Sequence, residues 1–122
     1  MKKNKLLIID DDLGFLLMAA DYFKSHGYKV YTADTGDQAV RIYKRERPKV
    51  VLLDFNMPLM TGEKLLPLLQ SVDPAVRAIV VTGCIGEEVE ERFKGLGYYA
   101  FFDKGSLSLE SLEEKVKEAL NY

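Results

Sequence analysis

The chain has 122 residues, of which 48% are hydrophobic and 30% are charged. This mixture is typical of one globular domain and excludes disordered, collagen-like and low-complexity proteins. The net charge is −2 and the basic residues are scattered along the chain. No basic surface for phosphate backbones is therefore predicted, and we expect no direct binding of nucleic acid.

The apolar runs are short compared with the roughly 18 residues that span a bilayer, so we expect no membrane segment. The first apolar run stops at Asp10, too early for a secretory signal peptide. Cys84 is the single cysteine and His26 the single histidine. These counts exclude an intramolecular disulfide and a zinc site built from cysteine or histidine. We therefore expect a cytoplasmic protein.

Five segments of strand length alternate with five segments of helical periodicity. In chain order, the expected strands cover residues 5–9, 28–32, 50–53, 78–81 and 99–102. The expected helices follow them at 15–23, 39–43, 65–69, 87–96 and 109–120. Gly27 ends the first helix and Ser108 can cap the last. Pro67 fits the third helix only in or near its first turn, where the missing N–H costs little.

Most of the expected strands are apolar throughout rather than alternating, which is typical of strands covered on both faces. Their alternation with helices predicts an α/β fold with a doubly wound parallel sheet. Ligands of such sheets bind outside the carboxyl ends of the strands. The polar residues that directly follow the strands should therefore lie at one edge. They are Asp10, Asp11, Asp12, Asp54, Thr82 and Lys104.

Several carboxylates at one edge repel each other, by about 4 kcal/mol per pair at 4 Å and an effective dielectric constant near 20. Either some of them bind protons or a cation lies among them. A ligand set of oxygens alone favours a hard divalent ion, Mg²⁺ or Mn²⁺. Together with the ammonium of Lys104 and the hydroxyl of Thr82, the set predicts phosphoryl transfer to a carboxylate. Asp12, nearest the first helix, is expected to cap it.

Five motifs in order resemble the CheY-like receiver domain of two-component response regulators. They are LIIDDD at 7–12, VLLDFNMP at 51–58, MTG at 60–62, IVVTG at 79–83 and AFFDK at 100–104. The resemblance runs from Lys5 to the last helix. It implies one receiver domain over residues 1–122 with a flavodoxin-like (βα)5 fold, whose five-stranded parallel sheet has the strand order 2-1-3-4-5.

The resemblance also implies a role for each residue at the predicted edge. Asp54 would be the phosphoacceptor, which takes a phosphoryl group from a histidine kinase or a histidine phosphotransfer protein and becomes a 4-aspartylphosphate. Asp10 and Asp11, with Asp54 and the backbone carbonyl of Asn56, would hold Mg²⁺.

Three further residues would complete the switch. Thr82 and Lys104 would bind the phosphoryl oxygens, and Phe101 would be the aromatic side chain whose rotamer follows activation. A phosphoryl group adds about −1.5 to −2 charge and new acceptor oxygens. If Thr82 moved toward those oxygens, it would leave space for Phe101, so a local charge change would become a packing change.

The chain departs from the family pattern after Lys104, where the family has proline, often after a cis bond, and this chain has Gly105. A cis bond before a residue other than proline costs about 2.5–4 kcal/mol, so we expect either a trans bond or a strained exception. We also expect Lys104 to be held less rigidly.

Because the sequence shows no effector domain before Tyr122, we expect output through a partner protein. The expected surface is formed by the fourth helix, the fifth strand and the fifth helix. There an apolar stripe and two tyrosines would form a sticky surface, on a monomer or a phosphorylation-dependent dimer. The stripe comprises Val89, Phe93 and Leu96, and the tyrosines are Tyr98 and Tyr99.

Three alternatives remain open. The chain could be the excised receiver of a longer DNA-binding regulator, or a receiver-like scaffold that acts without phosphorylation. It could also be a small phosphatase with an aspartate nucleophile. Such enzymes need a second acid two residues after the nucleophile, and position 56 is Asn56. We therefore expect no enzyme.

Overall fold

Five parallel strands form a single sheet in a computed structural model that describes residues 4–57, 59–83 and 87–121. The strand order is β2-β1-β3-β4-β5, which confirms the predicted 2-1-3-4-5 arrangement. The strands are β1 (Lys5–Ile9), β2 (Lys29–Ala33), β3 (Val50–Leu53), β4 (Arg77–Thr82) and β5 (Ala100–Asp103).

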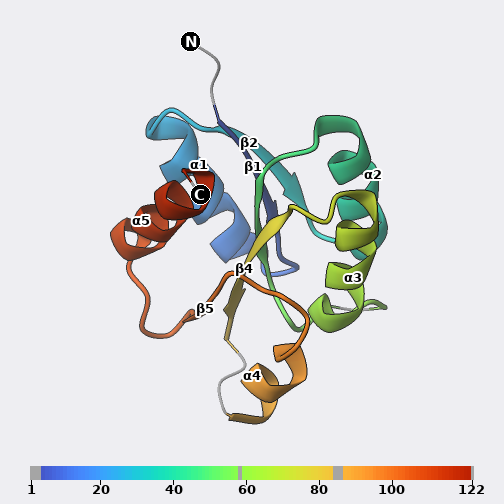
Figure 1. Cartoon of the computed structure of the whole chain (residues 1–122). Coiled ribbons are helices and arrows are strands. Elements are labelled where there is room, and N and C mark those ends of the chain that lie inside the picture. The colour runs from blue at the N-terminus through green and yellow to red at the C-terminus, as the bar shows by residue number, and fades with distance from the viewer. Residues whose placement is uncertain (1–3, 58, 84–86, 122) are drawn as a thin grey trace.

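Helices cover both faces of this sheet (Figure 1). On one face lie α1 (Leu13–Ser25) and α5 (Leu109–Leu120). On the other lie α2 (Gly36–Glu46) and α3 (Gly62–Val72), and α4 (Glu87–Phe93) packs its last residue against the same cluster. This two-sided cover explains why β3 is apolar at every position, since all four of its residues are buried.

Successive residues of a strand enter different clusters because side chains alternate across a sheet. Leu6 and Ile8 pack with α1 and α5, whereas Leu7 and Ile9 pack with α2 and α3. In β5, Phe101 and Phe102 divide in the same way between the two clusters. The two phenylalanine side chains therefore lie on opposite faces of the sheet.

Three helices begin at side chains that accept a hydrogen bond from the first turn. Asp12 accepts from the backbone N–H of Phe15, at 3.3 Å, and caps α1 as predicted. Ser108 accepts from the N–H of Ser111 and caps α5, also as predicted. Thr35 caps α2. The cap on α1 directs the chain from the acidic segment at the end of β1 into the helix.

Two expectations about the helices were wrong. Pro67 lies inside α3 beyond its first turn, at an exposed position of the helix. The helix α4 ends at Phe93 rather than at residue 96. Its apolar stripe also does not form a free surface, because Phe93 is buried and Val89 and Leu96 pack against the core.

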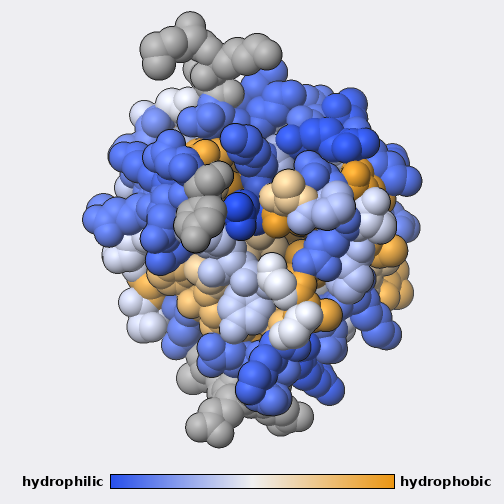
Figure 2. All heavy atoms as spheres, viewed as in Figure 1, coloured by the Kyte–Doolittle hydropathy of each residue, from blue (hydrophilic) through white to orange (hydrophobic). Residues whose placement is uncertain are grey.

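Figure 2 shows one side of the molecule, on which hydrophilic residues predominate and smaller apolar areas lie between them. Among the described residues, no helix is both long and apolar enough to cross a membrane. The large apolar side chains that are exposed include three on α1, namely Leu13, Leu17 and Met18. Cys84 lies outside the described residues.

The tightest backbone approach in the fold joins the start of α3 to the end of β3. A Cβ atom on Gly62 would clash with the Asp54 carbonyl oxygen. The Gly62 N–H also donates to the Phe55 carbonyl at 2.8 Å. Only glycine therefore allows α3 to begin directly beside Asp54.

We expect Gly62→Ala to destabilise the protein by about 1–3 kcal/mol, because the added methyl group forces backbone atoms apart. Urea unfolding measures this change. The matched control is Gly14→Ala in α1, where a Cβ meets only the Asp12 side chain at 3.4 Å. That variant should gain about 0.5–1 kcal/mol, since alanine is the better helix former. Equal stability of the two variants would contradict the steric argument.

Candidate functional site

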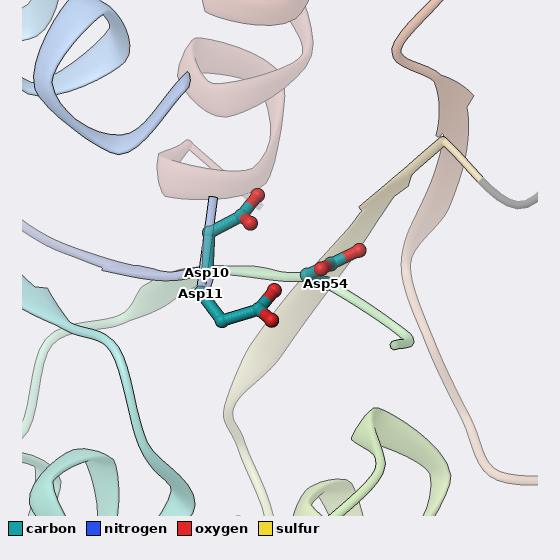
Figure 3. A group of neighbouring side chains, drawn as sticks. All are labelled: Asp10, Asp11 and Asp54. Atoms are coloured by element: carbon teal, nitrogen blue, oxygen red, sulfur yellow. The ribbon is translucent and has the colours of Figure 1, made fainter. Parts of the chain in front are cut away.

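Three aspartates lie together at the carboxyl edge of the sheet. Each offers a carboxylate oxygen to a group in which these atoms all lie within 4.8 Å of one another: Asp10, Asp11 and Asp54. In Figure 3, the side chains of Asp10 and Asp11 extend from one segment toward the neighbouring segment that carries Asp54. Asp10 and Asp54 are buried, whereas Asp11 is exposed. The predicted acidic cluster is therefore present.

Strand pairing sets the positions of the two buried carboxylates. Ile9 of β1 pairs with Leu53 of β3, so Asp10 and Asp54 leave adjacent strands at the same level. The Asp54 N–H donates to the Ile9 carbonyl at 3.0 Å and so extends the ladder by one bond. The carboxyl ends of parallel strands meet at one edge, and the register places these two residues next to each other.

Lys104 brings the positive charge to this cluster. Its Nζ lies 2.7 Å from Oδ2 of Asp10 and 3.9 Å from Oδ2 of Asp54. Its backbone N–H donates to the Thr82 carbonyl at 2.9 Å, which aligns the end of β5 with the end of β4. The Thr82 side chain is fully buried and hydrogen bonds to the Asp54 carboxyl. The sequence-predicted pair of Thr82 and Lys104 thus meets the acidic cluster.

Burial and like charge make these carboxyls hold protons more tightly. Removal from water and, to a smaller extent, the charge of the nearby Asp10 raise the pKa of Asp54 from 3.8 to about 7. Lys104 and the Thr82 hydrogen bond act in the opposite direction. Burial also raises the pKa of Asp10, against the lowering effect of Lys104 and of the Asp12 N–H, which donates to Asp10 at 2.9 Å. One lysine therefore does not compensate both buried carboxylates.

The donor set fits a hard divalent cation. It consists of carboxylate oxygens without histidine or cysteine, and its uncompensated negative charge would be neutralised by such an ion. The exposed Asp11 leaves the group open to solvent, which suits an ion that keeps several waters.

An open depression surrounds the acidic cluster. Its lining residues are Asp11, Asp12, Asp54, Asn56, Thr82, Gly83 and Lys104. The Asn56 side chain is exposed, and its backbone carbonyl as a metal ligand stays a prediction. The depression has room beside Asp54 for a group that approaches from solvent, and it presents a hydroxyl and an ammonium to that group.

Phe101 lies away from this depression, within an aromatic cluster that we define as Phe55, Phe93, Tyr98 and Phe101. Its ring centroid is 6.3 Å from that of Phe93 and 6.0 Å from that of Tyr98. The Phe93 ring in turn lies 5.5 Å from Phe55, which directly follows Asp54. The aromatic cluster thus joins the Asp54 segment, α4 and β5 through ring contacts.

Sequence reasoning missed two residues near the site. Phe55 was not singled out, although its place beside Asp54 was a usable indication. Phe15 of α1 presents its ring to Lys104, with the ammonium 4.8 Å from the ring centroid. Nothing in the sequence relates residues so far apart. The bond after Lys104 is trans, which is one of the two outcomes left open by the sequence, since the described residues contain no cis peptide bond.

Comparison with known proteins relates nearly the whole chain to one family. Residues 6–117 match the family model described as the response regulator receiver domain. Among solved structures, the chain is similar to a CheY-like response regulator receiver domain protein from Methanospirillum hungatei JF-1. The TM-score is 0.92 at 28% identity, over 98% of this chain and 95% of that one.

Two curated relatives differ in how much of their length is matched. Sporulation initiation phosphotransferase F of Bacillus subtilis is 32% identical over 98% of this chain and 96% of its own length. Transcriptional regulatory protein GlrR of Escherichia coli is 31% identical over 98% of this chain, which spans 27% of that protein. The similarity thus covers one protein almost entirely and a part of the other.

We expect Asp54→Asn to stabilise the metal-free protein above pH 7. The pKa of Asp54 is raised to about 7 in the folded protein, from 3.8 in the unfolded chain. The contribution of Asp54 to the free energy of unfolding is therefore fully present below pH 3.8 and is lost as the pH rises through 7. A pKa difference of one unit corresponds to about 1.4 kcal/mol. Because Asp54 and Asp10 can share one proton, the effect is smaller than the full difference, and we expect Asp54→Asn to gain about 1–3 kcal/mol.

Urea unfolding in chelator at pH 5 and pH 8 measures this effect. The difference in free energy of unfolding between Asp54→Asn and wild type should grow from pH 5 to pH 8 and should shrink when Mg²⁺ is added at pH 8. A difference that is independent of pH would contradict the raised pKa.

Proposed function

This chain belongs to the response regulator receiver domain family of two-component systems, and on that premise we propose that Asp54 is its phosphoacceptor. The observation that supports this assignment is the arrangement around Asp54. The carboxyl lies beside two other carboxylates, a buried hydroxyl and an ammonium, at an opening to solvent. The nucleophilic carboxylate, the metal-binding carboxylates and the groups that can bind phosphoryl oxygens thus lie together around Asp54.

The proposed reaction is transfer from a phosphohistidine. A carboxylate oxygen of Asp54 forms a bond to phosphorus while the bond between phosphorus and the donor imidazole nitrogen breaks. That nitrogen keeps the electron pair and takes up a proton. The product is a 4-aspartylphosphate at Asp54 and a free histidine on the donor. Only the ionised carboxylate is a nucleophile, so the proton that the raised pKa favours must first leave.

We further propose that Asp10, Asp11, Asp54 and the backbone carbonyl of Asn56 hold Mg²⁺. Bound there, the ion would neutralise charge on phosphoryl oxygens and favour the ionised form of Asp54. The chain's contribution is the cluster itself, held together by the pairing of β1 with β3 and by the ion pair between Lys104 and Asp10.

Thr82 and Lys104 are proposed to bind the phosphoryl oxygens that the metal does not. Both already interact with the Asp54 carboxyl, so little movement is needed for either to reach a group attached to it. Phe101 is proposed to report this movement, since it lies on β5 next to β4, with its ring packed against Phe93 of α4. A shift of Thr82 at the end of β4 would alter the space available to that ring.

Receiver domains are signalling domains rather than conventional enzymes, and the acid that an aspartate-nucleophile phosphatase would need is absent at Asn56. A scaffold that acts without phosphorylation is also disfavoured. It would have no reason to bury Asp10 and Asp54 beside each other at an energetic cost. We place the reaction in the cytoplasm, where kinases that use ATP form phosphohistidine.

The surface beside the site supports docking of a protein donor. Leu13, Leu17 and Met18 of α1 are 58%, 68% and 51% exposed, and α1 begins directly after the acidic segment. Exposed apolar side chains that gather at one place mark protein interaction sites. In contrast, α4 and the turn after it expose charged residues, namely Glu90 and Glu91 on the helix and Lys94 just beyond its end. We propose that a histidine kinase or phosphotransfer protein contacts α1.

Intact mass measurement after incubation with acetyl phosphate and Mg²⁺ tests the phosphoacceptor. We expect one phosphoryl group on the wild type that is lost in base, and none on Asp54→Asn or in the presence of chelator. An adduct of equal yield on Asp54→Asn would show that another residue is the acceptor. A folded wild type that binds no Mg²⁺ and gains no phosphoryl group would favour the scaffold.

A charged residue on α1 should block a protein donor but not a small one. We expect Leu17→Asp to slow transfer from autophosphorylated histidine kinases of the source organism by about tenfold or more, which corresponds to about 1.4 kcal/mol. Its rate with acetyl phosphate should stay at the wild-type value. Leu68→Asp on α3 is the matched control, since Leu68 is 43% exposed. Equal slowing by both variants would contradict docking on α1.

A further inference from the structure

Lys104 is held more firmly than its sequence context predicts. The sequence lacks a proline after Lys104, and a loosely placed side chain was therefore expected. In the structure the Lys104 side chain is only 15% exposed, and its ammonium contacts groups from several segments of the chain. Two of the residues that surround Lys104 have no place in the phosphoryl acceptor site described above. They are Phe15 and Asp103.

Phe15 holds the charged end of the side chain. Its ring centroid lies 4.8 Å from Nζ of Lys104, within the range in which the face of an aromatic ring attracts a cation. The ring is itself fixed, because Phe15 packs against the cluster under α1 and its N–H is bound by the Asp12 cap. Asp10 binds the same ammonium at 2.7 Å. The ring and the carboxylate thus restrict the ammonium together.

Asp103 holds the backbone on the other side of Lys104. Its Oδ1 accepts a hydrogen bond from the Gly105 N–H at 2.9 Å, which closes a turn around Lys104. Its carbonyl accepts from the N–H groups of Ser106 and Leu107 at 3.1 and 3.0 Å. With the bond from the Lys104 N–H to Thr82, the backbone is tied both at Lys104 and at the residues that follow it.

We propose that Phe15 and Asp103 are positioning residues that keep the Lys104 ammonium between Asp10 and Asp54, in place of the constraint that a proline after Lys104 would supply. Phe15 restricts the ammonium and Asp103 restricts the backbone from which it extends. The catalytic consequence rests on the proposed function of Asp54, whereas the placement of Lys104 does not. The two can therefore be tested separately.

The placement is tested by NMR on the metal-free protein without any phosphodonor. A ring below the ammonium shifts the ε-methylene protons of Lys104 upfield. We expect this shift in wild type and in Phe15→Tyr, and we expect its loss in Phe15→Leu. The Lys104 signals are assigned by their disappearance in Lys104→Arg.

The turn at Asp103 is tested by amide exchange. The Gly105 amide should exchange faster with solvent in Asp103→Ala than in wild type or in Asp103→Asn, which retains the acceptor oxygen. Unchanged spectra and exchange would overturn the proposal.

The effect on the reaction is tested with acetyl phosphate and Mg²⁺. We expect Phe15→Leu to slow phosphorylation about 3- to 30-fold, as loss of a partly buried cation–π contact implies. Asp103→Ala should slow it about 2- to 10-fold, as loss of one hydrogen bond implies. Phe15→Tyr and Asp103→Asn should stay within about twofold of wild type, since each retains the interaction.

A double-mutant cycle separates positioning from packing. In a Lys104→Ala background, Phe15→Leu should have no further effect on the rate, because the group that it positions is gone. Equal slowing in both backgrounds would overturn the role of Phe15. Phe23→Leu is the matched control, since Phe23 belongs to the same helix and cluster without contacting Lys104, and it should leave the rate unchanged. If wild type itself gains no phosphoryl group, the proposed function fails and the NMR result decides the placement.

Discussion

The ion pair between Lys104 and Asp10 is the interaction on which the site depends. Two carboxylates, Asp10 and Asp54, are buried at the edge of the sheet, and a single ammonium lies 2.7 Å from one and 3.9 Å from the other. Buried like charges at such distances repel strongly unless they are compensated. The lysine makes the arrangement tolerable but does not neutralise both carboxylates. Burial and the remaining like charge together raise the pKa of Asp54 to about 7. The same surplus charge is what would attract a divalent cation.

The fold brings these charges together through backbone geometry rather than through contacts among the side chains. The ends of β1 and β3 lie at one level because Ile9 pairs with Leu53, and the ends of β4 and β5 align because Thr82 pairs with Asp103. The core on both faces fixes this register, since a shift by one residue would move each buried side chain to the other cluster. The stability of the apolar sheet is thus what allows an unfavourable set of charges to exist at its edge.

A continuous set of ring contacts leads from this edge to the surface elements. Phe55 follows Asp54 in the chain, its ring contacts Phe93 of α4, and Phe93 contacts Phe101 of β5. The position of α4 is therefore linked both to the Asp54 segment and to β5. The apolar stripe of α4 serves this internal packing, and the surface that α4 offers to a partner is charged. Three of the exposed large apolar side chains lie instead on α1, beside the acidic segment.

The sequence by itself determined the alternation of strands and helices, the parallel sheet and the set of residues at its carboxyl edge, because hydrophobic periodicity and the ends of strands are local properties. Its motifs also identified the family and hence the strand order. Only the tertiary structure decided which groups touch Lys104. The ring of Phe15 and the turn at Asp103 compensate for the absent proline, and neither could be inferred from Gly105 alone. Tertiary packing likewise turned Phe93 inward and accommodated Pro67 on an exposed side of α3. These outcomes depend on distances between segments remote in the chain, which no local pattern encodes.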